Sequence, residues 1–308
     1  MKIMVAGGGA FGKEHLKTLA EIGGITLAVA EARVSEHDLL RQIFPLADCD
    51  ADAFALLDHF EPDGVIVATP AAAHASLATK ALERGIPVLV EKPVAPDDAT
   101  MRSLCQAAAV SRAFLQPGHI LRFSAGHRQL LDVLRSGEIG QLLSFSSRRY
   151  RDAGHAGRYA DIDPVLMTMI HDIDLALWFD GGTAVSANAT RRPSEMARSL
   201  TSARLESTSG SVWHLSTSWL HPGPDCPPDR VEIIGTKGSA EFEIGSHIEI
   251  FGSLQRRISV DASDNPLRAE LDCFLRGIRA GRSHAPVTPQ DAMNGLLAAE
   301  MIIGKLNQ

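Results

Sequence analysis

The sequence predicts an α/β protein in which a doubly wound parallel sheet is followed by an α+β domain with a large, mostly antiparallel sheet. A glycine-rich turn at Gly7–Gly12 joins an apolar strand to a helix. Apolar strands and helical patterns then alternate as far as residue 120. Beyond it, several strand patterns are separated by turn residues such as Ser209-Gly210 and Lys237-Gly238. We therefore expect two domains, residues 1–120 and 121–308.

The first half contains the strand–helix units that a parallel sheet requires. Continuous apolar runs predict buried strands at 2–6, 25–30, 64–68, 87–90 and 113–116. Capping and breaking residues predict the helices between them. The expected helices are one capped by Ser35 that ends before Pro45, one capped by Asp50 through Phe60, one at 72–84, and one capped by Asp97 through Ser111.

The second half changes character. A helix at 125–136 is followed by a strand at 141–150 and by a helix that starts after Asp163-Pro164 and runs to about Phe179. Strands with turn signals come next, and the proline-rich piece at 221–228 is expected to be a surface loop. Helices at 267–280 and 289–306 close the chain, and the last can pack back on the first domain.

The composition is that of an ordinary globular protein. With 308 residues, 45% of them apolar and 22% charged, the chain can build two domains with proper cores. A formal net charge of −7 disfavours nucleic acid as a partner. The four cysteines lie far apart without metal-ligand spacing, which predicts neither disulfides nor a metal site and favours a reducing, cytoplasmic location. No charged leader with an apolar core and no apolar run of ~18 residues is visible, so we expect neither a signal peptide nor a membrane partner.

The glycine-rich turn has the dinucleotide-binding spacing G-x-G-x-x-G. Gly7 allows a tight turn, Gly9 lets a pyrophosphate approach the backbone, and Gly12 lets the helix pack closely on the strand. With Ala10 and Phe11 between them, these residues open a helix whose first N–H groups attract phosphates. The sequence therefore predicts a Rossmann-type dinucleotide site at this loop.

An acidic residue stands at the end of the second predicted strand. Glu31 lies 19 residues after Gly12, where a carboxylate can accept both ribose hydroxyls of NAD and repel a 2′-phosphate. A solvated loop residue is the alternative. Arg33 leaves NADP open, because a guanidinium can hold the additional phosphate. We expect NAD, since the acid occupies the strand-end position itself.

Two side chains are candidates for catalysis. Lys92 follows the strand at 87–90, and at the ligand-binding edge of a parallel sheet its ammonium can polarise a substrate oxygen. A surface lysine at a loop start explains it equally well. His171 lies in a helix near Asp174, which can orient an imidazole that exchanges a proton near neutral pH. A structural helical histidine is the alternative.

Several motifs occur in the order of a known family. They are GGGAFG with His15, VATPAAAH at 67–74, EKP at 91–93, GHILRF at 118–123 and IHDIDLALW at 170–178. The later stretches SWLHP and DRVEIIGTKGSAEFE extend the similarity over nearly the whole chain. The chain resembles the glucose–fructose oxidoreductase / inositol dehydrogenase / rhizopine catabolism family (Gfo/Idh/MocA), and EKP after a Rossmann core is far more specific than the glycines alone.

The resemblance implies an NAD(P)-dependent oxidoreductase that acts on a ring carbon of sugars, cyclitols or nucleotide sugars. It implies that Lys92 contacts substrate, that His171 accepts the proton of the substrate hydroxyl, and that Arg122 lies beside the active site. It also implies a cis bond before Pro93 and an open second sheet that pairs subunits into homodimers or homotetramers. The cofactor site would be lined by Thr69, Pro70, His74, Glu91 and Lys92.

One position departs from the family pattern. Many members carry an aspartate one helical turn before the histidine, where this chain has Met167. Methionine cannot accept a proton or bind a hydroxyl strongly. Catalysis would then rest on Lys92 and His171, or on another acid, Asp163 or Asp174. The change favours an altered substrate or a non-catalytic NAD-binding sensor, and a glycosidase that uses tightly held NAD is a further alternative.

The sequence does not name the carbohydrate-like substrate. Pocket residues are expected from the segment 148–159, which ends at Tyr159. Its basic residues could meet an acidic or phosphorylated ligand, and they could equally form a solvated basic loop. These residues are Arg149, Arg151, His155 and Arg158.

Overall fold

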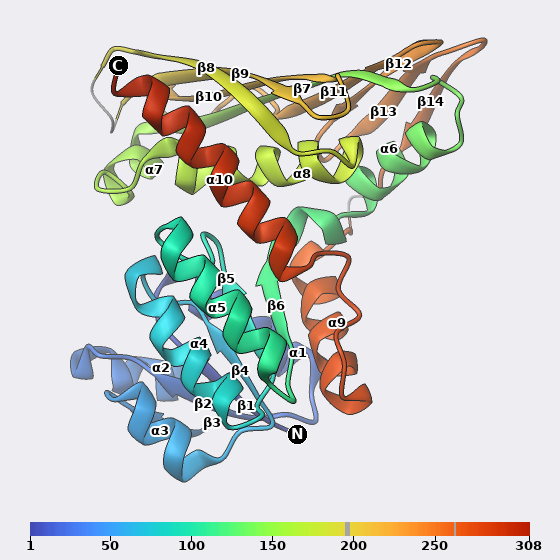
Figure 1. Cartoon of the computed structure of the whole chain (residues 1–308). Helices are drawn as coiled ribbons and strands as arrows, with labels where there is room; N and C mark the ends of the chain where they lie inside the picture. Colours follow the sequence, from blue (N-terminus) through green and yellow to red (C-terminus); the bar gives the residue numbers. More distant parts are fainter. Residues whose placement is uncertain (195–197, 262) are drawn as a thin grey trace. The chain divides into compact units, whose positions relative to one another are not determined.

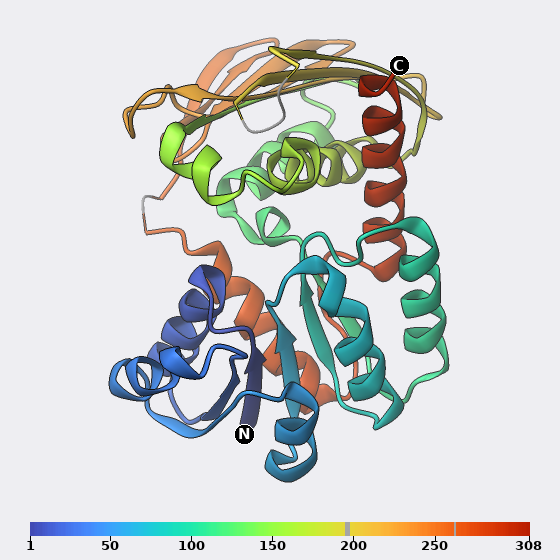
Figure 2. The same ribbon diagram turned by 90° about the vertical axis from the view of Figure 1, so that its left-hand side faces the viewer.

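The chain folds into two compact units in the computed structural model, which describes residues 1–194, 198–261 and 263–308. The first unit comprises residues 1–120 and 265–293, and the second comprises 121–264 and 294–308. Figures 1 and 2 show the elements of both units, coloured along the sequence. Each unit has its own sheet and its own apolar core.

The first unit is built on a six-stranded parallel sheet with the order β3-β2-β1-β4-β5-β6. The chain order reverses between β1 and β4, and ligands of such sheets bind outside the carboxyl ends of the strands at that point. The strands are β1 (Lys2–Ala6), β2 (Thr26–Ala30), β3 (Leu46–Asp50), β4 (Gly64–Val67), β5 (Val88–Glu91) and β6 (Leu115–Gly118).

Helices accompany these strands, as the alternating pattern predicts. Apolar residues of α1, α2 and α9 pack on the sheet in one core cluster, while α4 contacts both α3 and α5. The helices are α1 (Ala10–Ile22), α2 (His37–Ile43), α3 (Ala53–Phe60), α4 (His74–Glu83), α5 (Asp98–Val110) and α9 (Pro266–Ala280), with short 3₁₀ turns η1 (Val34–Glu36) and η2 (Ala71–Ala73).

Helix α9 packs in the first unit, although the domain boundaries expected from the sequence put it in the second. Its apolar face, with Leu271 and Phe274, joins the core of the parallel sheet. Gly64 makes room for it, because a Cβ there would lie 2.5 Å from the Ile278 side chain. The alternating pattern ends at residue 120, so nothing in the local sequence of α9 says which sheet it covers.

The second unit is built on an eight-stranded sheet with the order β14-β13-β12-β11-β7-β10-β9-β8. Its described pairs are antiparallel apart from β7 with β10, which confirms the mostly antiparallel sheet. The strands are β7 (Leu142–Asp152), β8 (Ala184–Arg192), β9 (Leu200–Ser207), β10 (Val212–His221), β11 (Arg230–Gly235), β12 (Gly238–Glu243), β13 (His247–Phe251) and β14 (Gln255–Ser259).

Helices cover one face of this sheet and leave the other bare (Figure 1). Along β9 and β11, buried residues alternate with exposed ones, as expected for a sheet with one solvated face. The covering elements are α6 (Ala125–Arg135), α7 (Ala153–Arg158), a π-helical turn (Val165–Met169), α8 (Ile170–Asp180) and the C-terminal part of α10 (Pro289–Leu306). A 3₁₀ turn (Ile120–Phe123) precedes α6.

Two predicted helix caps are wrong and one is confirmed. Ser35 lies inside η1 and caps no helix, and Asp52 rather than Asp50 accepts the first N–H groups of α3. The shift arises because Asp50 ends β3, which the prediction missed: in this edge strand only Cys49 is buried, so its apolar signal is weak. Asp97 caps α5, with its carboxylate 2.8 Å from the amide nitrogen of Thr100.

Candidate active site

The glycine turn forms a backbone cradle between β1 and α1. Gly7 has φ of +101°, and a Cβ there would lie 2.5 Å from the carbonyl oxygen of Ala68. Gly12 packs so closely that a Cβ would lie 1.8 Å from the carbonyl oxygen of Gly7. By contrast, a Cβ on Gly9 would meet nothing within 4 Å, and no side chain caps α1 there. The helix N-terminus therefore fits an anionic pyrophosphate.

Glu31 at the end of β2 is tied to this cradle. Its carboxylate accepts the N–H of Gly8 at 2.9 Å and three N–H groups of Arg33 at 2.7–3.2 Å. The hydrogen bonds from Arg33 hold the pKa of Glu31 below its usual value despite its burial. The Arg33 side chain is 59% exposed over this carboxylate. Glu31 is thus ionised at the position where NAD-binding folds hold a ribose.

The loops after β4 and β5 are joined by one imidazole. Both nitrogens of His74 contact backbone carbonyl oxygens, Nε2 that of Thr69 at 2.6 Å and Nδ1 that of Pro93 at 2.9 Å. Burial lowers the pKa of His74, while the two carbonyls oppose that shift. The Thr69 hydroxyl is buried without a hydrogen-bond partner among the described residues, which fits a polar ligand beside Pro70.

The EKP motif ends β5. The Lys92–Pro93 peptide bond is cis, as the resemblance implies. Glu91 is 6% exposed, and its Oε1 lies 2.8 Å from Nε2 of the fully buried His15 on α1. Its Oε2 accepts the backbone N–H of Lys92 at 3.3 Å. The Glu91 side chain is therefore directed into the protein, and the half-buried Lys92 follows it at the strand end.

In the second unit, the half-buried His171 lies in the first turn of α8, directly after the π-helical turn. The expected helix from Pro164 to about Phe179 is confirmed in its bounds, but its first turn is π-helical rather than α-helical. A π-turn adds a residue to the helical circuit and is frequent at functional sites. Met167 lies within this turn, and Trp219 donates to the hydroxyl of Thr168 at 3.1 Å.

Two buried arginine–carboxylate pairs flank His171 along α8. Arg122, 2% exposed, donates to both carboxylate oxygens of Asp174 at 2.8–3.1 Å and lies over the ring of Trp178. Arg149 makes the matching bidentate contact with Asp172 at 2.6–3.1 Å. Such fork-shaped pairs fix geometry as well as charge. They hold the helical turn that carries His171.

The carboxylates considered as substitutes at the Met167 position are both engaged by arginines. Asp174 pairs with Arg122, and Asp163 accepts Arg191 at 2.6 Å and the N–H of Val165 at 2.8 Å. The ring of Tyr159, at the end of α7, is tilted by 52° against that of His155, with ring centroids 4.8 Å apart. The roles of Arg122 and Tyr159 toward a substrate stay predictions.

Part of the basic segment 148–159 is engaged inside its own unit, and its role toward a ligand stays a prediction. Arg149 is 4% exposed and is held internally by Asp172 and by Asp229 at 3.4 Å. Arg151 donates to the same Asp229 at 3.0 Å. These guanidiniums therefore neutralise carboxylates of their own unit, and Arg149 is no solvated loop residue. The sequence shows the arginines but not that Asp229, some 80 residues later, lies against them.

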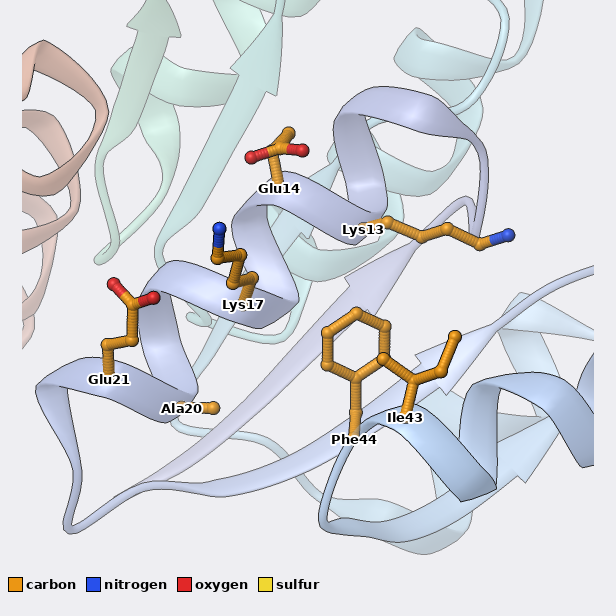
Figure 3. A pocket seen from close by; sticks show the side chains of 7 residues that line it. All are labelled: Lys13, Glu14, Lys17, Ala20, Glu21, Ile43 and Phe44. Carbon is orange, nitrogen blue, oxygen red and sulfur yellow. The ribbon is translucent and has the colours of Figure 1, made fainter.

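A surface depression of about 580 Å³ on the first unit contains no predicted site residue among the described residues that line it. Figure 3 shows Ile43 and Phe44 at the end of α2 pointing toward α1. Two lysines and two glutamates of α1 balance each other around it, so it has no preference for an anion. The lining residues are Lys13, Glu14, Lys17, Ala20, Glu21, Ile43 and Phe44.

Within residues 1–194, 198–261 and 263–308, no group of three or more potential ligands could hold a metal ion. Nor does any helix in those ranges have the length and hydropathy to cross a membrane. Sequence reasoning missed the charged residues Asp172, Asp229 and Glu270. For Asp172 and Glu270 the available signal was an acidic residue within an apolar helical stretch, IHDIDLALW and LRAELDCFL, whereas Asp229 precedes β11 and has no such signal.

Family models match most of the chain. Residues 1–119 match an oxidoreductase family with an NAD-binding Rossmann fold, and residues 127–241 match the GFO/IDH/MocA C-terminal domain. Inositol 2-dehydrogenase 2 of Saccharopolyspora erythraea is 35% identical over 208 residues, 64% of this chain and 59% of that protein. Inositol 2-dehydrogenase of Pseudarthrobacter chlorophenolicus is 27% identical over 59% of this chain and 54% of that protein. Inositol 2-dehydrogenase of Ralstonia nicotianae is 26% identical over 97% of this chain and 91% of its own.

Solved structures share the fold. UDP-N-acetylglucosamine 3-dehydrogenase from Acidithiobacillus ferrooxidans superposes with a TM-score of 0.84 at 24% identity, covering 99% of this chain and 97% of its own. Scyllo-inositol dehydrogenase from Lactobacillus casei, with bound NAD(H) and scyllo-inositol, gives 0.85 at 21% identity, covering 99% and 96%. With the glycine cradle, the EKP turn and the matching models of both halves, the chain belongs to the Gfo/Idh/MocA oxidoreductase family.

Proposed function

We propose that the protein is an NAD(P)-dependent oxidoreductase that transfers a hydride between nicotinamide and a ring secondary alcohol of a sugar, cyclitol or nucleotide sugar. The observation that carries the proposal is the pairing of an NAD-binding Rossmann domain with an intact EKP turn and the helix histidine. A cyclitol is the favoured substrate class, since the relatives at 25–35% identity are named inositol 2-dehydrogenases.

The residues of the first unit fit the dinucleotide. The uncapped N-terminus of α1 and the open space at Gly9 would hold the pyrophosphate, and Glu31 would accept the ribose hydroxyls. Thr69 offers a buried hydroxyl at the end of β4. Because the ionised Glu31 repels a 2′-phosphate, NAD is the proposed cofactor, while the exposed Arg33 keeps NADP within reach.

Bound nicotinamide supplies the acceptor or donor for the hydride. During oxidation of the alcohol, the C–H bond yields the hydride and the O–H bond yields a proton, which we assign to the imidazole of His171. The Lys92 ammonium would stabilise negative charge on the same oxygen. In the reverse direction His171 returns the proton to the carbonyl oxygen. Asp172 and Asp174 keep the turn that carries His171 in place through their arginine partners.

Lys92→Ala tests this assignment. We expect kcat to fall by about 10²- to 10³-fold, as on removal of one stabilising donor, while NADH binding measured by fluorescence stays nearly unchanged. Lys80→Ala, which removes an exposed lysine paired with Glu83 on α4, is the matched control and should behave like wild type. Wild-type turnover in Lys92→Ala would refute the role of the lysine.

A second candidate function is a non-catalytic NAD-binding sensor, favoured by Met167 in the position of the family aspartate. A panel of sugars, cyclitols and nucleotide sugars, assayed for NADH or NADPH production, separates the two. Turnover of any panel member supports the enzyme. Ligand-dependent thermal stabilisation by a panel member without turnover, in the presence of NAD, supports the sensor.

We further propose a cytoplasmic homodimer or homotetramer. All four cysteines are free thiols, which agrees with a reducing compartment. The bare face of the eight-stranded sheet is the proposed subunit contact. It presents Leu200 on β9, Ile234 on β11 and Phe251 on β13, each about 40% exposed, among polar residues.

A further inference from the structure

A buried carboxyl group lies behind the EKP turn. Glu270 is 0% exposed on the face of α9 that packs in the first unit, beside the buried Leu271 and Phe274. Neither of its carboxyl oxygens has a hydrogen-bond partner among the described residues. Burial without hydrogen bonds strongly disfavours an ionised carboxylate, so such a group takes up a proton instead.

Glu270 lies near buried polar residues that include the neighbours of Lys92, although its carboxyl makes no hydrogen bond to them within the described residues. The side-chain amide of Gln116 on β6 donates to the backbone carbonyl of Glu270 at 3.3 Å. Glu91 is close enough for its charge to act on Glu270. Glu91 in turn contacts His15 at 2.8 Å and the N–H of Lys92 at 3.3 Å.

The fold makes dedicated space for Glu91 in this cluster. β5 and β6 pair in register, with Glu91 opposite Gly118. A Cβ on Gly118 would lie 3.0 Å from the Glu91 Cα and 3.1 Å from its carboxyl carbon, tighter than ordinary contact. A side chain at position 118 would therefore press on the carboxylate that holds His15.

Two carboxyl groups in one buried site resist double ionisation. Burial raises the pKa of Glu270 well above its ordinary value, and the negative charge of Glu91 raises it further. The other titratable groups that face the pair are His15 on α1, which contacts Glu91, and Cys273 on α9, whose own thiol pKa is raised mainly by burial and in small part by Glu270. Asp272 lies on the solvent side of the same helix.

We propose that Glu270 is a positioning residue of the candidate active site: it holds a proton at neutral pH, so that the Glu91–Glu270 pair carries one negative charge. Glu91 is the member of the pair that contacts His15 and the backbone N–H of Lys92. If Glu270 also ionised, the second charge would repel Glu91 from this arrangement. The link to catalysis rests on the proposed function, whereas the proton itself is testable without turnover.

The test compares wild type, Glu270→Gln and the control Asp272→Asn by urea unfolding at several pH values. The unfolded chain releases the Glu270 proton near pH 4.5, the ordinary value, while the folded protein keeps it to higher pH. Stability of wild type relative to Glu270→Gln should therefore fall as pH rises from that value, by up to about tenfold in the folding constant per pH unit. Above the folded pKa the difference becomes constant. Asp272→Asn should stay parallel to wild type.

Two readouts connect the proton to the site. In the infrared spectrum at neutral pH, wild type should show the carbonyl band of a protonated carboxyl group that Glu270→Gln lacks. NADH affinity of wild type should weaken at alkaline pH, and that of Glu270→Gln should not. Parallel unfolding curves for wild type and Glu270→Gln, or identical infrared spectra in the carboxyl region, would overturn the proposal.

If Glu270→Gln prevents folding, Glu270→Met takes its place, because burial also raises the pKa of Asp172 and a band in wild type alone would not identify Glu270. A protonated-carboxyl band at neutral pH that Glu270→Met lacks supports the proposal, and identical spectra of the two proteins overturn it. None of these measurements uses a substrate. A wild type that turns over no sugar or cyclitol would therefore count against the proposed function alone, and an ionised Glu270 would count against this inference alone.

Discussion

At the scale of single residues, the glycine turn shows two glycines kept for different reasons. A Cβ on Gly12 would collide with the carbonyl oxygen of Gly7 at 1.8 Å, so the close approach of α1 to β1 requires it. Gly9 has ordinary backbone angles and empty surroundings within 4 Å. The protein itself does not need a glycine at position 9, and the space there suits a ligand.

This difference predicts opposite behaviour for two alanine variants. Gly9→Ala should unfold in urea like wild type but bind NADH at least about tenfold more weakly, the effect of ~1.4 kcal/mol. Gly12→Ala should lose roughly 1–3 kcal/mol of stability through overpacking. Urea unfolding and fluorescence titration measure both effects. Wild-type NADH affinity in Gly9→Ala would mean that the pyrophosphate does not lie against this turn.

Residues with a positional signal could be predicted from the sequence. The glycine spacing and the distance to Glu31 follow from local geometry, so the sequence predicts the cradle. Arg149, Asp172 and Glu270 could not be predicted, because their meaning depends on partners far along the chain. A charged residue in an apolar pattern shows that a partner is needed, but not which residue supplies it.

At the scale of elements, α8 is held at its start by two buried ion pairs directly after a π-helical turn. Both carboxylates come from α8, while Arg122 lies in the 3₁₀ turn at 120–123 and Arg149 on β7. The first turn of the helix is thereby fastened to two other segments of its unit. His171, between Asp172 and Asp174 on one side and the π-turn on the other, has little freedom to shift along the helix axis.

Removing one partner of a buried ion pair should lower the free energy of unfolding far more than replacing both partners with apolar residues. Among the described residues, Asp172→Ala leaves the buried Arg149 guanidinium with the longer contact to Asp229, and we expect a loss of about 3–5 kcal/mol in the free energy of unfolding. The double variant Arg149→Met/Asp172→Leu should recover most of it. Chemical denaturation measures both. A cost below about 1 kcal/mol for Asp172→Ala would show that the carboxylate is dispensable there.

The elements themselves were predicted where the periodic signal is strong. The strands of the parallel sheet other than β3, and the helices α5, α6, α9 and α10, follow the expected ranges within a few residues. Edge strand β3 was missed because it buries one residue, and its absence from the prediction moved the α3 cap from Asp52 to Asp50. The π-turn was missed because the spacing of apolar residues does not distinguish i→i+4 from i→i+5 hydrogen bonding over a single turn.

At the scale of the whole molecule, the outer face of the eight-stranded sheet predicts self-association. Ile234 and Phe251 are exposed on this face, which helices do not cover (Figure 1), and we expect the subunits to meet there. The strand patterns and turn signals predict a mostly antiparallel second sheet, and the resemblance implies that this sheet is open. The sequence does not predict which elements cover the other face, because α9 and α10 carry no local mark of the sheet that they pack against.

Ile234→Asp tests the subunit contact. We expect wild type to elute from size-exclusion chromatography with light-scattering masses of two or four chains, and Ile234→Asp to shift toward one chain. Leu254→Asp, in the exposed turn between β13 and β14, is the control and should keep the wild-type mass. A monomeric wild type, or an unchanged mass for Ile234→Asp, would contradict the proposed contact.

The His74 imidazole connects the loops that follow β4 and β5. One nitrogen of its ring contacts the backbone carbonyl of Thr69, just after β4, and the other contacts that of Pro93, which directly follows Lys92. Without such a contact the two loops could move independently. With it, we expect a displacement of the loop after β4 to displace the loop after β5. The positions of the Thr69 hydroxyl and the Lys92 ammonium are therefore coupled through His74. A nucleotide that shifts Thr69 on binding would shift Lys92 as well.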